Sequence, residues 1–242
     1  MNARAAGSAD RPHLPVAAPG GHGEPGHLVV LEGVDKSGRS THTRLLEERL
    51  RHGGYGVIRT SFVTSRLAAP RIRDVRRQAD PDPVETFLLY AADLTERIEQ
   101  VILPSLRAGL VVLVDRYAYT PIARAAARGV DLAWLESILG FAPPPDLVCF
   151  LDVAPADALR RHREIAEARL DAGGLDAYRQ FQEGVYRIFD EAAERWGFTR
   201  VPATAEIEST HAALYRPVGD LLDDGGAEAG QRRQPASLRG RR

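Results

Sequence analysis

One stretch of the sequence decides the fold: Gly33-Val34-Asp35-Lys36-Ser37-Gly38-Arg39-Ser40-Thr41. It matches the phosphate-binding pattern G-x-x-x-x-G-K-[ST] except at Arg39, where the pattern has a lysine. The two glycines allow a tight backbone turn, so backbone amides and the start of the next helix face phosphate oxygens, and the Ser40 hydroxyl is placed to bind Mg²⁺. The stretch therefore predicts a nucleoside triphosphate site to which all nine residues belong.

Arg39 is the unusual feature of this loop, because a planar guanidinium replaces a compact ammonium. Lys36 is the only lysine among the 32 basic residues of the chain. The substitution is therefore consistent with a general avoidance of lysine. The alternative is that Arg39 marks a protein that binds nucleotide without catalysis.

Composition limits the class of protein. A chain of 242 residues with 44% hydrophobic content suits one α/β domain. A net charge of −1 gives no reason to expect nucleic acid or an anionic membrane as a partner. The lone Cys149 lies in an apolar run and predicts a packed thiol rather than a disulfide. The sequence has neither an apolar run long enough to span a membrane nor the apolar segment of a signal peptide. We therefore expect a soluble cytoplasmic protein.

Both ends of the sequence are typical of disordered tails. Residues 1–26 are rich in Ala, Gly, Pro and Arg and show neither helical nor strand periodicity, and residues 224–242 are rich in Gly, Gln and Arg. We assign no function to the basic C-terminal tail. The folded domain is predicted to span residues 27–223.

Strand and helix signals alternate between these tails. Helical periodicity covers residues 39–52 and, after Pro83, residues 83–106. Apolar strands are predicted at residues 27–32, from residue 56, and at 110–114, 146–151 and 198–201. This order predicts a three-layer α/β fold of the P-loop NTPase class, with a five-stranded parallel sheet flanked by helices. Ligands are expected where the carboxyl ends of the strands meet.

A second motif, Asp115-Arg116-Tyr117, stands at the end of the third predicted strand. A carboxylate there is well placed to hold Mg²⁺ opposite Ser40, so both are candidate metal ligands. Alternatively, Asp115 only caps the helix that follows. We interpret Arg116 as a clamp on the phosphate of an acceptor, the alternative being a surface ion pair.

The ordered motifs resemble those of the thymidylate kinase family, over residues 27 to about 223. The resemblance implies ATP-dependent phosphorylation of a nucleoside monophosphate, with dTMP as acceptor and Mg²⁺ as cofactor. Homodimers are common in this family, and the apolar helix from Pro83 is either a contact between two copies or a helix buried in the core. The segments that carry it are the loop at Glu32–Thr41, Tyr90-Ala91-Ala92-Asp93, Val101-Ile102-Leu103-Pro104-Ser105-Leu106, Asp115-Arg116-Tyr117, Pro145-Asp146 and Leu151-Asp152-Val153.

The resemblance also implies an acceptor site. It assigns Asp35 to the acceptor sugar, Tyr90 to the aromatic position beside the base, and Arg116 and Tyr117 to the acceptor as well. It also implies that Lys36 and Arg39 are two catalytic cations over the transferring phosphate. Leu94 stands where the family usually has an arginine, and Arg124-Ala125 replaces a Tyr-Gln pair. A kinase for a different nucleotide or nucleoside therefore remains an alternative. Arg66, Arg124 and Arg128 are candidates to restore phosphate contacts, or are ordinary exposed arginines.

A lid over the donor phosphates is expected from the basic stretch at residues 158–163, which is followed by Gly173-Gly174. Its cations are Arg160, Arg161 and Arg163, and closure of such a lid excludes water from a phosphoryl group in transit. The alternative is a helix with a solvated basic face.

Overall fold

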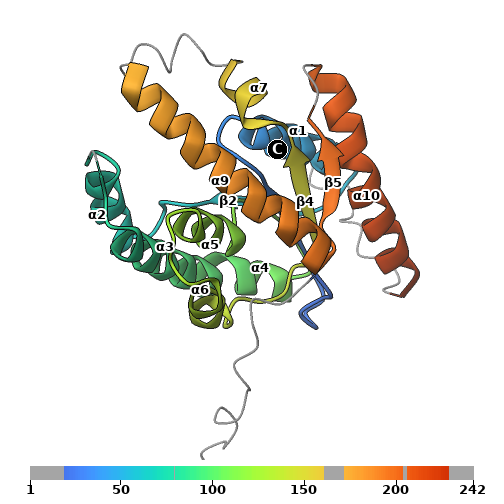
Figure 1. Ribbon diagram of the computed structural model, residues 1–242. Helices are drawn as coiled ribbons and strands as arrows, with labels where there is room; N and C mark the ends of the chain where they lie inside the picture. Colours follow the sequence, from blue (N-terminus) through green and yellow to red (C-terminus); the bar gives the residue numbers. More distant parts are fainter. Residues whose placement is uncertain (1–18, 79, 161–171, 204–205, 229–242) are drawn as a thin grey trace, which may run out of the picture.

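Five parallel strands form one sheet in the order β2-β3-β1-β4-β5 (Figure 1). The computed structural model describes residues 19–78, 80–160, 172–203 and 206–228. The predicted fold class is confirmed, and the predicted strands lie within one or two residues of those observed. They are β1 (His27–Glu32), β2 (Val57–Ser61), β3 (Val111–Asp115), β4 (Leu147–Asp152) and β5 (Thr199–Pro202).

The central strand β1 brings the two sequence motifs together. It pairs with β3 on one side and β4 on the other, and its Leu31 lies opposite Asp115 of β3. Because all the strands are parallel, their carboxyl ends share one edge of the sheet. The phosphate-binding loop after β1 and the motif after β3 are therefore neighbours at that edge.

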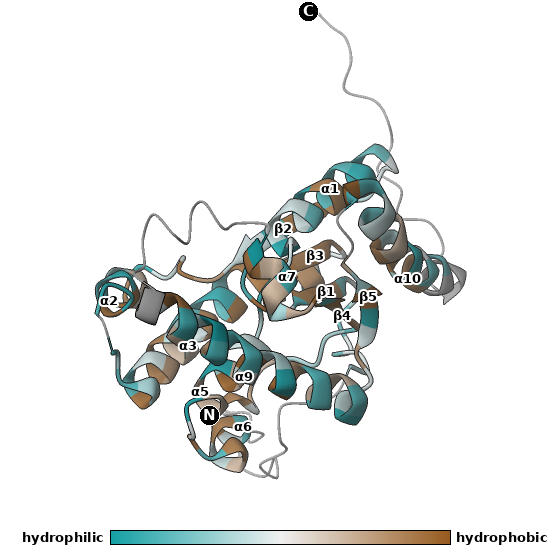
Figure 2. Cartoon of the chain, turned by 45° about the horizontal axis from the view of Figure 1, so that its top comes forward, coloured by the Kyte–Doolittle hydropathy of each residue, from teal (hydrophilic) through white to brown (hydrophobic). Residues whose placement is uncertain are grey.

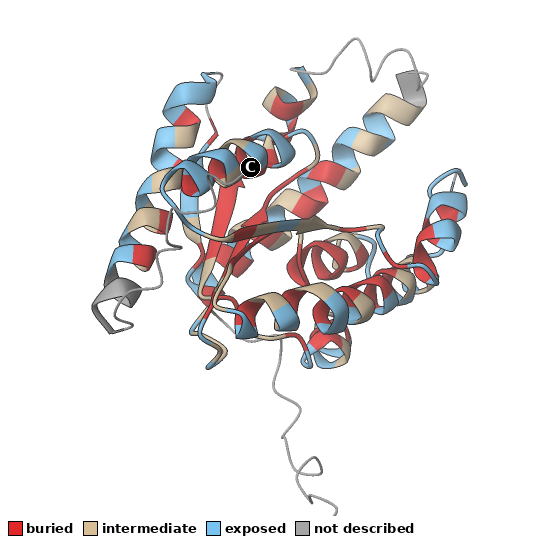
Figure 3. Cartoon of the chain, turned by 180° about the vertical axis from the view of Figure 1, so that it is seen from behind, coloured by how far each residue is buried: buried red, intermediate tan, exposed pale blue. Residues whose placement is uncertain are grey.

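Helices cover both faces of the sheet. Side chains alternate along β1, so Leu28 and Val30 pack into one apolar cluster and Val29 and Leu31 into the other. Hydrophobic residues gather on the strands, whereas the helices carry both hydrophobic and hydrophilic residues (Figure 2). Buried residues also concentrate on the strands and exposed ones on the outer surfaces of the helices (Figure 3). The first face carries α2 (Ala68–Val75), α3 (Pro83–Arg97), α4 (Leu103–Arg107), α5 (Tyr119–Ala126), α6 (Leu132–Leu139) and α9 (Ala172–Trp196). The second carries α1 (Arg39–His52), α7 (Pro155–Arg160) and α10 (Ile207–Glu228).

The helix predicted after Pro83 is one helical path with a widened turn. Between α3 and α4 the backbone forms a π-helix, Ile98–Ile102, in which the Leu103 N–H bonds to the Ile98 carbonyl. Pro104 follows directly and has no N–H to donate to the carbonyl four residues earlier, so the path changes its hydrogen-bond pattern here. The wider turn keeps the helical path continuous up to Arg107, shortly before β3.

The structure differs from the prediction at both ends of the domain. Part of the predicted N-terminal tail contacts the fold: the Gly20 N–H donates to the Pro145 carbonyl at 3.0 Å, and His22 bonds to the Asp146 carboxylate at 3.0 Å. At the other end, α10 continues five residues beyond position 223, to Glu228. Within the described ranges, no helix is both long and apolar enough to cross a membrane. Cys149 is buried in β4, as predicted.

Candidate active site

The loop after β1 curls back on itself before α1 begins. Gly33 has φ 146° and Gly38 has φ 98°, and a Cβ atom on Gly33 would lie 2.9 Å from the Leu151 carbonyl oxygen. Lys36 also has a positive φ, of 68°. These backbone angles favour glycine at both ends of the loop. They place successive N–H groups around a concave surface at the N-terminus of α1, where the helix dipole favours anions.

Arg39, the first residue of α1, turns its side chain into this loop and is 6% exposed. One terminal nitrogen donates to the carbonyl of Gly33, to that of Val34 at 2.5 Å and to the Ser37 hydroxyl at 3.0 Å. The Nε donates to Asp115 at 3.1 Å. Burial lowers the pKa of Arg39 to about 10, so the guanidinium is still charged at neutral pH.

Ser40 and Asp115 meet at the same edge. The Ser40 hydroxyl donates to the second oxygen of the Asp115 carboxylate at 2.5 Å, across the pair of strands β1 and β3. No group of three or more metal-ligating side chains occurs in the described part of the chain. One hydroxyl and one carboxylate still fit Mg²⁺, because this ion takes few protein ligands and completes its shell with water and substrate phosphate.

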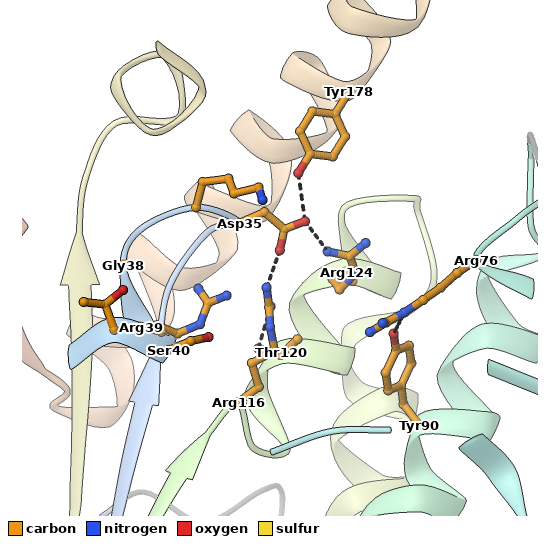
Figure 4. A pocket seen from close by; sticks show the side chains of 12 residues that line it. Asp35, Gly38, Arg39, Ser40, Arg76, Tyr90, Arg116, Thr120, Arg124 and Tyr178 are labelled. Atoms are coloured by element: carbon orange, nitrogen blue, oxygen red, sulfur yellow. Dashed lines mark hydrogen bonds and ion pairs between the residues drawn. The ribbon is translucent and has the colours of Figure 1, made fainter. Parts of the chain in front are cut away.

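Asp35 connects the loop to the opposite wall of the site (Figure 4). One carboxylate oxygen accepts from Arg116, and the other accepts from Arg124 at 3.2 Å, Tyr178 at 2.9 Å and Gln182 at 3.1 Å. Burial alone raises the pKa of Asp35, but the charges of Arg116 and Arg124 outweigh it and hold the pKa well below its ordinary value. The carboxylate is therefore ionised throughout the neutral range.

These elements enclose a cavity of about 710 Å³. Five cationic side chains and a single carboxylate line it, which suits a polyanionic ligand. Tyr90 and Arg76 form one end, where the Arg76 Nε donates to the Tyr90 hydroxyl at 2.8 Å (Figure 4). The lining residues are Asp35, Lys36, Gly38, Arg39, Ser40, Thr41, Arg76, Tyr90, Arg116, Thr120, Arg124 and Tyr178.

Comparison with known proteins agrees with this geometry. The family model described as thymidylate kinase matches residues 31–214. The chain belongs to the thymidylate kinase family. Among similar proteins, the probable thymidylate kinase of Pyrococcus abyssi is 36% identical over 77% of this chain and 92% of its own length. The thymidylate kinase of Caldanaerobacter subterraneus subsp. tengcongensis is 27% identical over 81% of this chain and 97% of its own length.

The loop residues predicted from the sequence fall into two groups in the structure. Lys36, Ser40 and Thr41 are exposed and line the cavity, together with Asp35, Gly38 and the buried Arg39. Gly33, Val34 and Ser37 are buried and shape the loop from beneath. Tyr90 and Arg116 also line the cavity.

The prediction that Tyr117 contacts the acceptor is wrong for this structure. Its side chain is fully buried, and its hydroxyl donates to the Pro143 carbonyl at 3.0 Å. The left-handed backbone of Arg116, φ 74°, directs the arginine toward the cavity and the next residue into the core. Tyr117 therefore packs behind the site, against the ring of Tyr119.

Of the three predicted lid cations, Arg160 lies within the described residues, and the structure does not place it at the cavity. Arg160 is exposed at the end of α7 and pairs with Asp157, one turn away, at 2.8 Å. It is absent from the residues that line the cavity. Arg161 and Arg163 lie outside the described residues.

Sequence reasoning missed several residues of this thymidylate kinase site. Tyr178 and Gln182 come from α9, and no motif marks them. Arg124, left open from the sequence, lines the cavity, whereas Arg128 lines a smaller neighbouring cavity of about 300 Å³. Arg66 is exposed and lines neither cavity.

Glu32, the last residue of β1, was also missed as part of the site. It is fully buried and accepts from the Tyr117 N–H at 2.8 Å, the Thr120 N–H at 3.2 Å and the Thr120 hydroxyl at 2.5 Å. It therefore anchors the turn that carries Arg116. Burial raises the pKa of Glu32 from 4.5 to about 6, although these hydrogen bonds oppose the shift.

This shift predicts a pH-dependent stability. Between pH 4.5 and 6, the folded protein holds a proton on Glu32 that the unfolded chain releases, so the free energy of unfolding should fall as the pH rises. The loss attributable to Glu32 is about 2 kcal/mol across this window. Urea unfolding at several pH values should show this slope in the wild type and a flatter curve in Glu32→Gln, which keeps a carbonyl acceptor. Parallel curves for the two proteins would contradict the assignment.

Proposed function

We propose that this protein transfers the γ-phosphoryl group of ATP to dTMP and produces ADP and dTDP. The observation that carries the proposal is that the phosphate-binding loop and the arginines Arg116 and Arg124, proposed to hold the acceptor, line the same cavity of about 710 Å³. Its relatives are named as thymidylate kinases or probable thymidylate kinases, and this chain aligns with most of the length of each.

Catalysis in this proposal consists of alignment and charge neutralisation. The loop amides hold the donor phosphates, Lys36 and Arg39 offset their charge, and Arg116 holds the acceptor phosphate with its fork of donors. Asp35 orients Arg116, and by resemblance to the family it is the residue that contacts the sugar of the acceptor. The acceptor phosphate is ionised at neutral pH, so the residues need not include a general base.

Ser40 and Asp115 are the residues that would hold Mg²⁺. The ion, when bound, neutralises negative charge on the terminal phosphates of the donor. The loop would hold the donor so that these phosphates lie beside the two ligands. Removal of divalent ions with a chelator should accordingly abolish turnover.

The direct test is product formation from ATP and dTMP by the purified protein. We expect ADP release that depends on dTMP and a matching amount of dTDP, both measured by chromatography. ATP binding without ADP formation for any acceptor would favour a non-catalytic nucleotide-binding protein instead.

A different monophosphate or a nucleoside as acceptor is the second candidate, and Leu94 favours it. This side chain is fully buried in the core and cannot contact a base. The end of the cavity that would receive the base carries Arg76 and Tyr90 instead. A panel of nucleoside monophosphates and nucleosides, compared by kcat/KM, separates this candidate from dTMP.

Arg39→Lys should leave turnover unchanged or raise it. The ammonium is more compact than the guanidinium that fills the loop and can follow the transferring phosphate. Arg39→Met, which keeps the stem but removes the charge, should lower kcat by about 10²-fold. Steady-state kinetics with ATP and the best acceptor measure both effects. A lysine variant that gains activity only from zero would indicate that the wild type is a degenerate enzyme.

A homodimer is part of this proposal. Val84 and Leu88 of α3 are partly exposed apolar residues on the helix expected to form the contact. Sedimentation of the purified protein tests the dimer. The cytoplasmic location stays a prediction from the sequence.

A further inference from the structure

A buried arginine outside the cavity lining lacks the partners that burial normally demands. Arg97, the last residue of α3, is 2% exposed. Its Nε and one terminal nitrogen have no hydrogen-bond partner among the described residues, and no ion pair to it occurs there. Its guanidinium carbon lies 4.3 Å from the centre of the Phe62 ring. A buried cation with unpaired donors destabilises the fold. The one hydrogen bond that Arg97 does make therefore points to a reason for its burial.

That remaining contact is with the backbone of Arg116. The other terminal nitrogen of Arg97 donates to the Arg116 carbonyl at 3.2 Å. The N–H of Arg116 donates to the Leu31 carbonyl at 3.1 Å. Arg116 has φ 74°, a conformation that a residue with a side chain adopts only when its surroundings hold it. Arg97 and β1 therefore secure both polar groups of a strained residue.

The same turn of α3 holds a second strained loop. Asp93 is fully buried, and its carboxylate accepts from the N–H groups of Val63, Thr64 and Ser65 at 3.0, 2.8 and 2.8 Å. Val63 has φ 70°. Asp93 also supplies the largest favourable charge acting on Arg97. One helical turn thus fixes the loops that follow β2 and β3, both at the edge of the sheet where ligands bind.

We propose that Arg97 is a positioning residue, which holds the Arg116 backbone in the left-handed conformation that aims its guanidinium at the acceptor phosphate. The inference rests on the proposed function, because it gives Arg116 the acceptor as its target. Arg97 itself does not line the cavity and acts through the Arg116 carbonyl. Phe62 and Asp93 keep its side chain in place without competing for that donor.

The test removes the donor and keeps the volume. Arg97→Met should lower kcat/KM for the acceptor by about 10-fold to 100-fold, because small misplacements of a reacting group cost this much. The KM for ATP should change little. In an Arg116→Ala background, Arg97→Met should add almost no further loss, because the side chain that it positions is already absent. Arg97→Lys, which keeps a charged donor, should recover part of the activity.

Hydrogen exchange gives a readout independent of turnover. Peptides that contain residues 115–118 should exchange faster in Arg97→Met than in the wild type. The matched control is Arg107→Met, which removes an exposed arginine that pairs with Glu24 at the end of α4. If Arg97→Met does not fold, Arg97→Lys is measured in the same way. Multiplicative losses in the double variant, or unchanged exchange at residues 115–118, would overturn the proposal. A wild type inactive on every acceptor, with the faster exchange still present, would refute only the proposed function.

Discussion

Asp115→Asn is expected to lower kcat by about 10²-fold to 10³-fold. The amide has nearly the shape of the carboxylate but carries no charge. It can no longer offset the Arg39 guanidinium at 3.1 Å or attract a divalent ion beside Ser40. The measurement is kcat at saturating ATP and acceptor across a range of Mg²⁺ concentrations, with thermal unfolding to verify the fold.

Asp152→Asn is the matched control. Asp152 also ends a strand of the sheet, β4, but it accepts from Tyr186 at 2.8 Å and Arg200 at 3.4 Å and does not line the cavity. We expect almost no change in its kcat. Equal losses of kcat in Asp115→Asn and Asp152→Asn would mean that any negative charge at this edge of the sheet supports activity. That result would contradict a specific role of Asp115 in binding the metal.

Arg116→Ala should lower kcat/KM for the acceptor by about 10³-fold and leave the KM for ATP nearly unchanged. The guanidinium is partly buried, pairs with Asp35 and approaches the Thr120 hydroxyl at 3.5 Å, so it is oriented before substrate arrives. Arg116→Lys should recover only part of the loss, because an ammonium cannot offer two parallel donors to a phosphate. Initial rates at varied acceptor concentration measure this.

Arg124→Ala provides the comparison within the same cavity. Arg124 binds the other oxygen of the Asp35 carboxylate, and its guanidinium also lies 4.9 Å from the Phe181 ring. We expect a smaller loss than at Arg116. If Arg116→Ala instead raises the KM for ATP and spares the acceptor, the assignment of donor and acceptor sides is reversed.

Local sequence signals predicted much of the fold. The strand at residues 27–32 contains the continuous apolar run Leu28–Leu31 and is followed by a glycine, and α1 begins and ends at the residues where its periodicity does. Asp115 was placed correctly because a polar residue that ends a buried parallel strand reaches the ligand edge. These predictions succeeded because neighbours in the sequence carry the information.

The acceptor side could not be predicted in this way. Tyr178 and Gln182 lie 143 and 147 residues from Asp35, and no spacing rule connects a loop with a helix so distant. Arg124 carried no signal in a chain whose basic residues are almost all arginine. Tyr117 was misplaced because the positive φ of Arg116 reverses the expected direction of the next side chain.

Asp35 gives the site a form of communication between its two halves. It belongs to the donor loop, yet its carboxylate neutralises arginines on the acceptor side and receives bonds from α9. In the proposed function, an acceptor phosphate at Arg116 would compete with this carboxylate, and any bond that it displaced would loosen the loop proposed to bind ATP. The two substrates would then share one coupling free energy. Whatever factor the acceptor imposes on the affinity for ATP, ATP imposes in equal measure on the affinity for the acceptor.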